Sequence, residues 1–158
     1  MRRSTINWII IGIVGVIATS IFVFFSIASE PYTSARSQAN KIAYKSADID
    51  NPNYFSNFTQ DNQYYSVGGW TKENKYRYVM INAKSGKIKI LKSNKYNRET
   101  TKNKILSKYN PKRINDINLG IIHNKPTWEV SFTNKNNSIG YAMVDYETNK
   151  ITQLINNI

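Results

Sequence analysis

The sequence predicts an α+β protein: an N-terminal transmembrane helix followed by two tandem small units, each a helix packed on an antiparallel β-meander. Three observations lead to this fold class. A long uncharged apolar segment opens the chain, short runs of alternating apolar and polar residues follow it, and much of the pattern between residues 40 and 91 recurs 63 positions later. The predicted divisions are residues 1–29 for a cytoplasmic tip and membrane anchor, 30–93 for the first unit and 94–158 for the second.

The first segment carries no charged side chain from Ser4 to Ser29. Its core, Trp8 to Ala28, is long enough to rise about 31 Å as a helix, which is close to the hydrocarbon thickness of a bilayer. Backbone amides in lipid must bond within the chain, so a single spanning segment has to be helical. The segment therefore predicts a membrane anchor.

Arg2 and Arg3 precede this segment, and basic residues favour the cytoplasmic side. We therefore expect a single-pass protein of the cell membrane with a cytoplasmic N-terminus and an extracellular C-terminal domain. The alternative is a cleaved signal peptide with its cleavage motif at Ser26–Ala28, but the apolar run is longer than an ordinary signal peptide requires.

The next segment predicts an amphipathic helix, because small and apolar residues from Ala35 to Ile49 recur near helical spacing. Its apolar face is thin, and Pro52 with its asparagine neighbours is expected to end it. Alternation rich in aromatic and β-branched residues then predicts strands in "YYSVGGW", "YRYVMI" and "KIKIL", joined by the short loops "TKENK" and "NAKSGK".

A shift of 63 residues places Tyr78 on Tyr141 and Gly86 on Asn149, with no gap across helix, strands or turns. Glycine and asparagine both tolerate a positive φ, so the two copies are expected to use the same tight turn. In the second copy Trp128 alternates with polar neighbours, which predicts a sheet with one buried face under the preceding helix. We interpret this pattern as an internal duplication.

The sequence contains no catalytic constellation, so we expect no enzyme, no cofactor and no metal site. There is no cysteine, and the single histidine, His123, is expected in a loop. Asp145 stands before the repeated turn, where capping is a better interpretation than base catalysis. Glu129 has no carboxylate partner in its strand.

The chain has 22 lysine and arginine residues and 10 acidic residues, and only Arg2 and Arg3 precede the apolar segment. The exported part therefore has an excess of about ten positive charges. Outside a membrane this charge favours anionic lipid headgroups or phosphate-rich wall polymers over nucleic acid. A solvated surface that keeps the protein soluble is the alternative.

The first unit differs from the second in an aromatic outward-facing set that includes Tyr64 and Trp70. An exposed tryptophan is a candidate anchor for a partner, because aromatic residues concentrate binding energy. The alternative is that this face packs on the second unit or on the loop "NYFSNF". The candidate partner-binding residues are Tyr64, Trp70 and Arg77.

The stretches "YYSVGGWTKENKYRYVMINAKSGKIKIL" and "TWEVSFTNKNNSIGYAMVDYETNKI" resemble the TseB-like family of cell-wall elongation regulators of Gram-positive bacteria. The "VDYETNKI" turn is also similar to that of PepSY-type modules, although Asn149 stands where glycine is usual. The resemblance implies two cystatin-like or PepSY-like units without catalysis. It also implies binding to a membrane-anchored penicillin-binding transpeptidase during sidewall synthesis. A PepSY-like inhibitor or chaperone of an exported peptidase is the alternative.

Overall fold

The computed structural model describes residues 31–157 of the chain. The transmembrane segment predicted within residues 1–29 lies outside the described residues. Among those that are described, no helix is long and apolar enough to cross a membrane. Residues 31–47 are helical, and the described residues from 38 onward form one compact unit.

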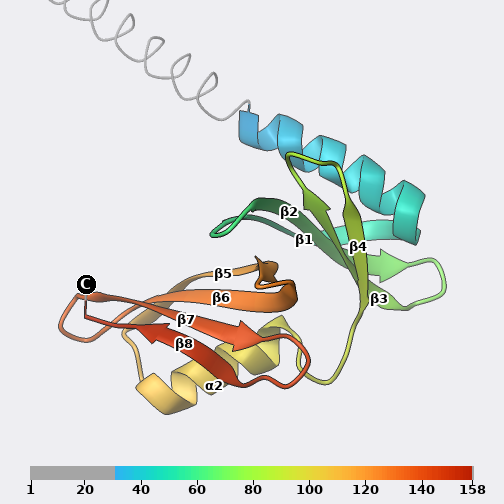
Figure 1. Ribbon diagram of the computed structural model, residues 1–158. Helices are drawn as coiled ribbons and strands as arrows, with labels where there is room; N and C mark the ends of the chain where they lie inside the picture. The colour runs from blue at the N-terminus through green and yellow to red at the C-terminus, as the bar shows by residue number, and fades with distance from the viewer. Residues whose placement is uncertain (1–30, 158) are drawn as a thin grey trace, which may run out of the picture. The chain divides into compact units, whose positions relative to one another are not determined.

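Two four-stranded antiparallel sheets follow the helix (Figure 1), each with its strands in sequence order. The first sheet consists of β1 (Ile49–Thr59), β2 (Gln63–Thr71), β3 (Tyr76–Asn82) and β4 (Ile88–Lys92). Helix α2 (Arg98–Tyr109) leads to the second sheet, which consists of β5 (Arg113–Ile122), β6 (Lys125–Thr133), β7 (Ile139–Asp145) and β8 (Ile151–Ile155).

The predicted fold class is wrong in the way it combines helices and sheets. It packed one helix on one antiparallel meander of three strands in each unit. The structure adds a first strand to each sheet, and it joins Tyr54 and Tyr78 of the first sheet with Trp128 of the second and Ile105 of α2 in one hydrophobic cluster. The helices and sheets therefore do not form two separate helix-on-meander layers.

Strand β1 was missed because it contains Pro52 and three asparagines, which are depleted in strands. The structure tolerates them because β1 is an edge strand with register shifts at Ile49/Asn51 and Pro52/Tyr54, where a proline disturbs no ladder. The segment "NYFSNF", interpreted as a loop, is part of this strand.

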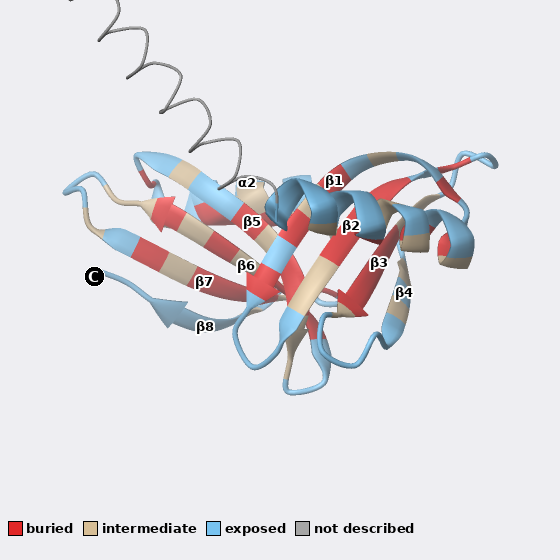
Figure 2. Ribbon diagram, turned by 90° about the horizontal axis from the view of Figure 1, so that it is seen from above, coloured by how far each residue is buried: buried red, intermediate tan, exposed pale blue. Residues whose placement is uncertain are grey.

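The first sheet is buried on both faces, as the red segments of Figure 2 show along β2 and β3. On one face Val67 and Val79 pack in a cluster with Ala39 and Ala43 of the 31–47 helix. On the other face Tyr78 packs into the larger cluster shared with the second sheet. The burial of this second face comes from contact between the two sheets.

Hydroxyl groups join the two sheets where β5 lies against β1 and β2. The Ser66 hydroxyl donates to the Leu119 carbonyl oxygen over 2.7 Å, and the Tyr54 hydroxyl donates to the Ile117 carbonyl oxygen over 3.1 Å. The Leu119 amide donates to the Ser56 hydroxyl over 3.2 Å. These groups are buried, so the bonds satisfy polar atoms that water does not reach.

The repeated turn is confirmed in detail. Gly86 and Asn149 both have positive φ, of 68° and 55°. The Asn82 side-chain oxygen accepts from the Ser85 amide over 2.8 Å, and Asp145 accepts from the Thr148 amide over the same distance. Asp145 therefore caps its turn as predicted.

The repeat does contain a gap, contrary to the prediction. Thr59 pairs with Gln63 in the first sheet, and Ile121 pairs with Pro126 in the second. The second connection is therefore one residue longer, so the shift is 62 residues before it and 63 after it. The buried helix positions follow the same rule, because Ala43 corresponds to Ile105. Lysine and asparagine matches hid this offset in the sequence.

Candidate partner-binding groove at Trp70

Trp70 lies near the end of β2 and pairs with Tyr76 of β3. Its side chain is 44% exposed. The two rings meet edge to face, with centroids 5.1 Å apart. The exposure on which its candidacy as a partner anchor depends is therefore present, and one edge of the ring rests on a tyrosine.

A cavity of about 280 Å³ opens beside Trp70. Tyr76 and Tyr78 of β3 form one part of its wall, and Asn97, Arg98 and Glu99 at the start of α2 form another. A second, more polar hollow of about 630 Å³ is lined by Trp70 together with Asn51, Lys72 and Asn74. Trp70 therefore stands as an aromatic ridge between two hollows, and we call this arrangement the Trp70 groove.

The wall of the groove is continuous with the core. The Tyr76 ring meets Tyr78 with centroids 5.1 Å apart, and Tyr78 meets buried Trp128 at 5.4 Å. The Tyr76 hydroxyl donates to the Asn53 side-chain oxygen over 2.7 Å. These contacts fix the ring orientations before any partner arrives.

The tyrosines in this wall are neutral hydrogen-bonding groups. Burial raises the pKa of Tyr78 above its usual value, and the neighbouring tyrosines add to the shift. Burial also raises the pKa of Tyr76. Ionised phenols are therefore not available for acid–base chemistry at neutral pH.

The polar wall is set by the N-cap of α2. The Asn97 side-chain oxygen accepts from the Glu99 amide over 3.0 Å and from the Thr100 amide over 3.1 Å. This cap fixes the first turn, so Arg98 projects beside the tyrosines, with its guanidinium 5.7 Å from the Tyr54 ring centre. Glu99 is paired with Lys102 over 3.4 Å.

Tyr64 and Arg77 do not converge with Trp70 into one site. Tyr64 lies six residues away on the same face of β2, about 20 Å along the strand, and packs against the shared cluster. Arg77 lies on the opposite face, because it pairs with Gly69. Its guanidinium donates to the Ala47 carbonyl oxygen over 2.9 Å and lies 3.8 Å from Asp48. Their partner-binding roles stay predictions.

Most of the face that carries Trp70 is covered by the second sheet. Ser66 and Gly68 are buried, and Ser66 bonds to β5. The alternative interpretation, that this face packs on the second unit, is therefore correct for the middle of β2. Trp70 remains exposed because it lies near the end of β2, beyond the part that the second sheet covers.

Comparison with known proteins gives the fold. No protein-family model matches the chain, and no curated protein matches it. The solved structure of the YpmB protein from Bacillus subtilis matches with a TM-score of 0.63 and 23% sequence identity, covering 76% of this chain and 95% of that chain. The chain shares the YpmB fold. At this identity the likeness establishes the architecture and leaves activity and partners open.

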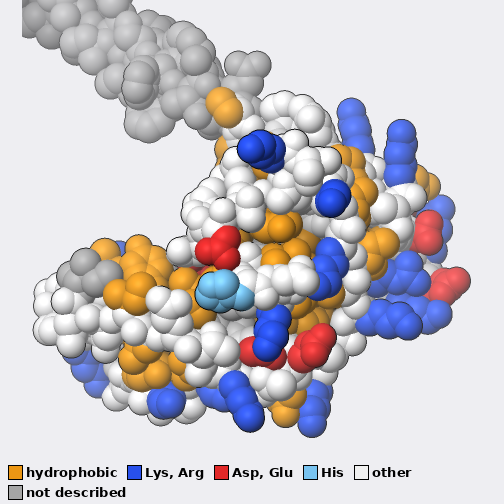
Figure 3. Space-filling model, in the orientation of Figure 1, with side chains coloured by type: hydrophobic (Ala, Val, Ile, Leu, Met, Phe, Trp, Pro, Cys, Tyr) orange, Lys and Arg blue, Asp and Glu red, His pale blue; other side chains and the backbone are white. Residues whose placement is uncertain are grey.

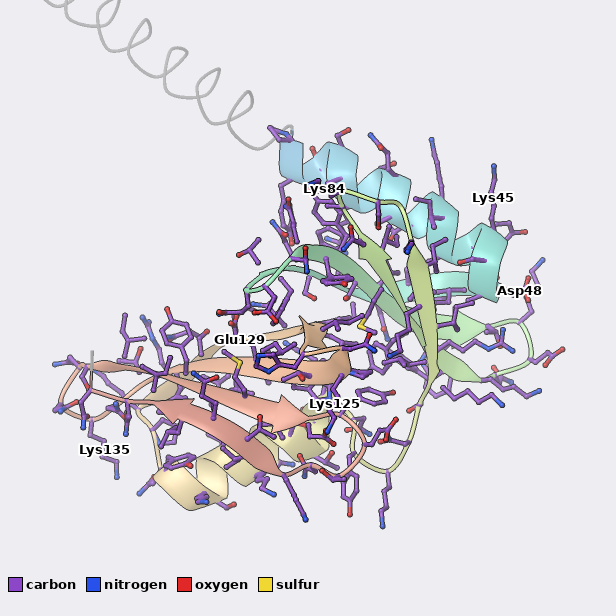
Figure 4. The ribbon with its side chains drawn as sticks, viewed as in Figure 1. Lys45, Asp48, Lys84, Lys125, Glu129 and Lys135 are labelled. Carbon is purple, nitrogen blue, oxygen red and sulfur yellow. The ribbon has the colours of Figure 1, made fainter. Side chains whose placement is uncertain are left out.

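His123 and Glu129 lie away from the groove. Both contact the turn between β1 and β2, His123 from the turn between β5 and β6 and Glu129 from β6. The His123 amide donates to an Asp61 carboxylate oxygen over 3.2 Å, and Glu129, labelled in Figure 4, accepts from Gln60 over 2.5 Å. Both residues therefore help to hold the first sheet against the second.

The part of the groove that α2 supplies was not predicted from the sequence. Asn97 followed by "RETT" is a recognisable N-cap signal, which would have placed a helix start there. The N-cap signal does not show that the start of this helix lies beside Trp70. That proximity arises because α2 and β3 pack against the same hydrophobic cluster.

Proposed function

We propose that the protein is a non-catalytic regulator of cell-wall elongation, related to the TseB-like group, that acts at the cell membrane. In this proposal the C-terminal part lies outside the cell and binds a penicillin-binding transpeptidase. Three features support it: the fold shared with YpmB, the sequence resemblance, and the uncharged segment from Ser4 to Ser29. The observation that carries it is the exposed Trp70 between two hollows.

A tryptophan in this setting suits a protein partner. Tryptophan is enriched among the residues that dominate binding energy, especially beside pockets that exclude water. Because the ring already rests on Tyr76, binding costs little side-chain entropy. A common membrane location would add effective concentration, so a modest interface suffices.

The basic surface supports a secondary contact with anionic wall polymers or lipid headgroups. Figure 3 shows lysine and arginine side chains spread over the visible face of the described residues, with acidic groups at only a few places. Such a charge excess attracts anionic surfaces from a distance and is weakened by salt. No nucleic-acid role is proposed.

The test is site-specific photocrosslinking in cells that carry the full chain. A photoreactive residue replaces Trp70 in one variant, and in a matched control it replaces Ile139, which is 40% exposed on β7. We expect position 70 to crosslink a membrane-anchored transpeptidase and position 139 to give none. Trp70→Ala should reproduce the cell-shape defect of a deletion, whereas Ile139→Ala should not.

Recovery of an exported peptidase at position 70 would replace this proposal with the inhibitor or chaperone function. Normal cell shape after deletion of the gene, together with equal crosslinking from both positions, would refute it.

A further inference from the structure

Strand β4 forms an open edge of the first sheet. Within the described residues it pairs only with β3, in five consecutive pairs without a register shift. Figure 2 shows β4 at the margin of the sheet, with no described element beyond it. A regular open edge offers unpaired backbone groups to another chain.

The hydrogen-bond pattern identifies which groups face outward. Asn82 donates to the Lys87 carbonyl oxygen, and Ser93 donates to the Tyr76 carbonyl oxygen. Bonded pairs alternate in an antiparallel ladder, so the amides and carbonyls of Ile88, Ile90 and Lys92 point away from β3. The Lys92 carbonyl oxygen accepts from the Tyr146 hydroxyl over 2.8 Å, in agreement with this direction.

The residues whose backbone faces outward also expose apolar side chains. Ile88 is 44% exposed and Ile90 is 45% exposed. They lie on the same face as Ile81 and Val79, their partners on β3. A strand added at this edge would therefore gain backbone bonds and a short apolar strip together.

The surrounding charge is of one sign. From Tyr76 to Lys92 the chain carries Arg77 and four lysines and no acidic residue. None of the lysines, which are Lys84, Lys87, Lys89 and Lys92, takes part in an ion pair within the described residues. Figure 4 marks Lys84 in the turn that joins β3 to β4. This edge is complementary to an acidic chain.

The equivalent edge in the second repeat differs in both respects. Met143 pairs with Gln153 and Val144 with Ile151, so Thr152 is an extra residue in a bulge. A bulge twists an edge away from a straight incoming strand. Strand β8 itself has no charged side chain.

We propose that β4 binds an extended acidic segment of a partner protein, which adds to the first sheet as a fifth strand beside Ile88 and Ile90. Ile88 and Ile90 do not line the Trp70 groove. The proposal does not depend on the identity of the partner there. A second copy of the chain suits the edge poorly, because pairing β4 with β4 would bring lysines together. An anionic polymer would match the charge but would use neither the backbone groups nor the isoleucines.

The test measures peptide binding to the full-length chain in detergent micelles by titration calorimetry. The probe is a peptide of about seven residues that alternates glutamate and valine, the length of an ordinary strand. A lysine–valine peptide and inorganic polyphosphate serve as comparisons. Of the three probes, we expect only the acidic peptide to bind at moderate salt. Hydrogen exchange measured on the complex should show slower exchange of the Ile88 and Ile90 backbone amides.

Variants separate strand addition from simple charge attraction. The backbone amide of Ile90 points away from β3 and makes no hydrogen bond to that strand. Ile90→Pro removes this amide and should weaken peptide binding at least tenfold. Leu154→Pro makes the matching change on β8 and should leave it unchanged. Lys89→Glu provides an independent test that does not alter the backbone, and it should also weaken binding.

Equal binding of the acidic and basic peptides would overturn the proposal. So would an unchanged affinity for a folded Ile90→Pro variant, or binding of polyphosphate in place of the peptide, which would assign the edge to anionic polymers. Failure of the unaltered chain to bind the acidic peptide, with intact crosslinking at position 70, would refute this inference and leave the proposed function standing.

Discussion

The hydroxyl of Ser66 donates a 2.7 Å hydrogen bond to the carbonyl oxygen of Leu119, across the contact between the two sheets. Both residues have no exposed surface. The buried hydroxyl at the centre of β2 thus finds its hydrogen-bond acceptor in the second repeat. Each sheet supplies a hydrogen-bond partner for a buried polar atom of the other.

Ser66→Ala should lower the free energy of unfolding by about 1–2 kcal/mol, because the buried carbonyl of Leu119 loses a donor. Chemical denaturation followed by circular dichroism measures this change. Ser107→Ala, at an exposed position of α2, should change it by less than about 0.5 kcal/mol. Equal effects of the two substitutions would contradict the role given to the sheet contact.

The turn capped by Asp145 should weaken in acid. Partial burial raises the pKa of Asp145, but hydrogen bonds from the Thr148 hydroxyl and from the Thr148 and Glu147 amides outweigh it, so the pKa lies below its usual value. A lowered carboxyl pKa stabilises the fold above that value, and the contribution is lost as the pH falls through the folded pKa.

Asp145→Asn should therefore flatten the pH dependence of unfolding below about pH 4. Its cost at neutral pH should be no more than about 1 kcal/mol, because the group is largely solvated. The turn at Asn82 is the built-in comparison, since an amide already makes the equivalent bonds there. An unaltered acid transition in the variant would show that the carboxylate does not contribute.

The buried tyrosines should resist ionisation until the protein unfolds. Burial raises the pKa of Tyr54 and Tyr78, and that of Tyr146 to about 12. The stability that these neutral phenols supply is present below the usual tyrosine pKa of 10.0 and is lost as the pH rises through their folded pKa values. Alkaline titration by phenolate absorbance should therefore show a late step that coincides with loss of circular dichroism.

Tyr146→Phe should reduce the amplitude of that late step by one phenol. In concentrated denaturant all 11 tyrosines should titrate in one transition. A single transition in the folded protein would contradict the buried aromatic cluster.

Arg77→Ala should destabilise the protein by about 1–2 kcal/mol, because the guanidinium donates to the Ala47 carbonyl oxygen at the end of the 31–47 helix. Thermal unfolding measures the change, and Arg113→Ala at an exposed position is the control. Crosslinking at position 70 should persist in the Arg77 variant at a temperature where it is folded. Loss of crosslinking there would assign Arg77 a direct contact with the partner.

Local patterns identified the strands and turns that depend on local chemistry. The tight turns at Gly86 and Asn149 follow from residues that tolerate positive φ. Alternation located β3, and the repeat located β7. The first strand of each sheet was not found. In β1, Pro52 and the asparagines oppose strand propensity, and only pairing with β2 overrides it. Trp70 was singled out by its sequence, whereas Arg98 reaches the same groove through packing.

The sequence by itself determined that the chain repeats a helix-and-strand pattern, that a tight turn recurs at Gly86 and Asn149, and that Trp70 alternates onto one face of its strand. The tertiary structure decided which residues of that face remain exposed and which sheet edge remains regular. The second sheet covers Ser66, α2 builds a wall beside Trp70, and the bulge at Thr152 leaves β4 as the regular edge. Alternation fixes the direction of a side chain relative to its strand, but its exposure depends on residues tens of positions away that pack against it.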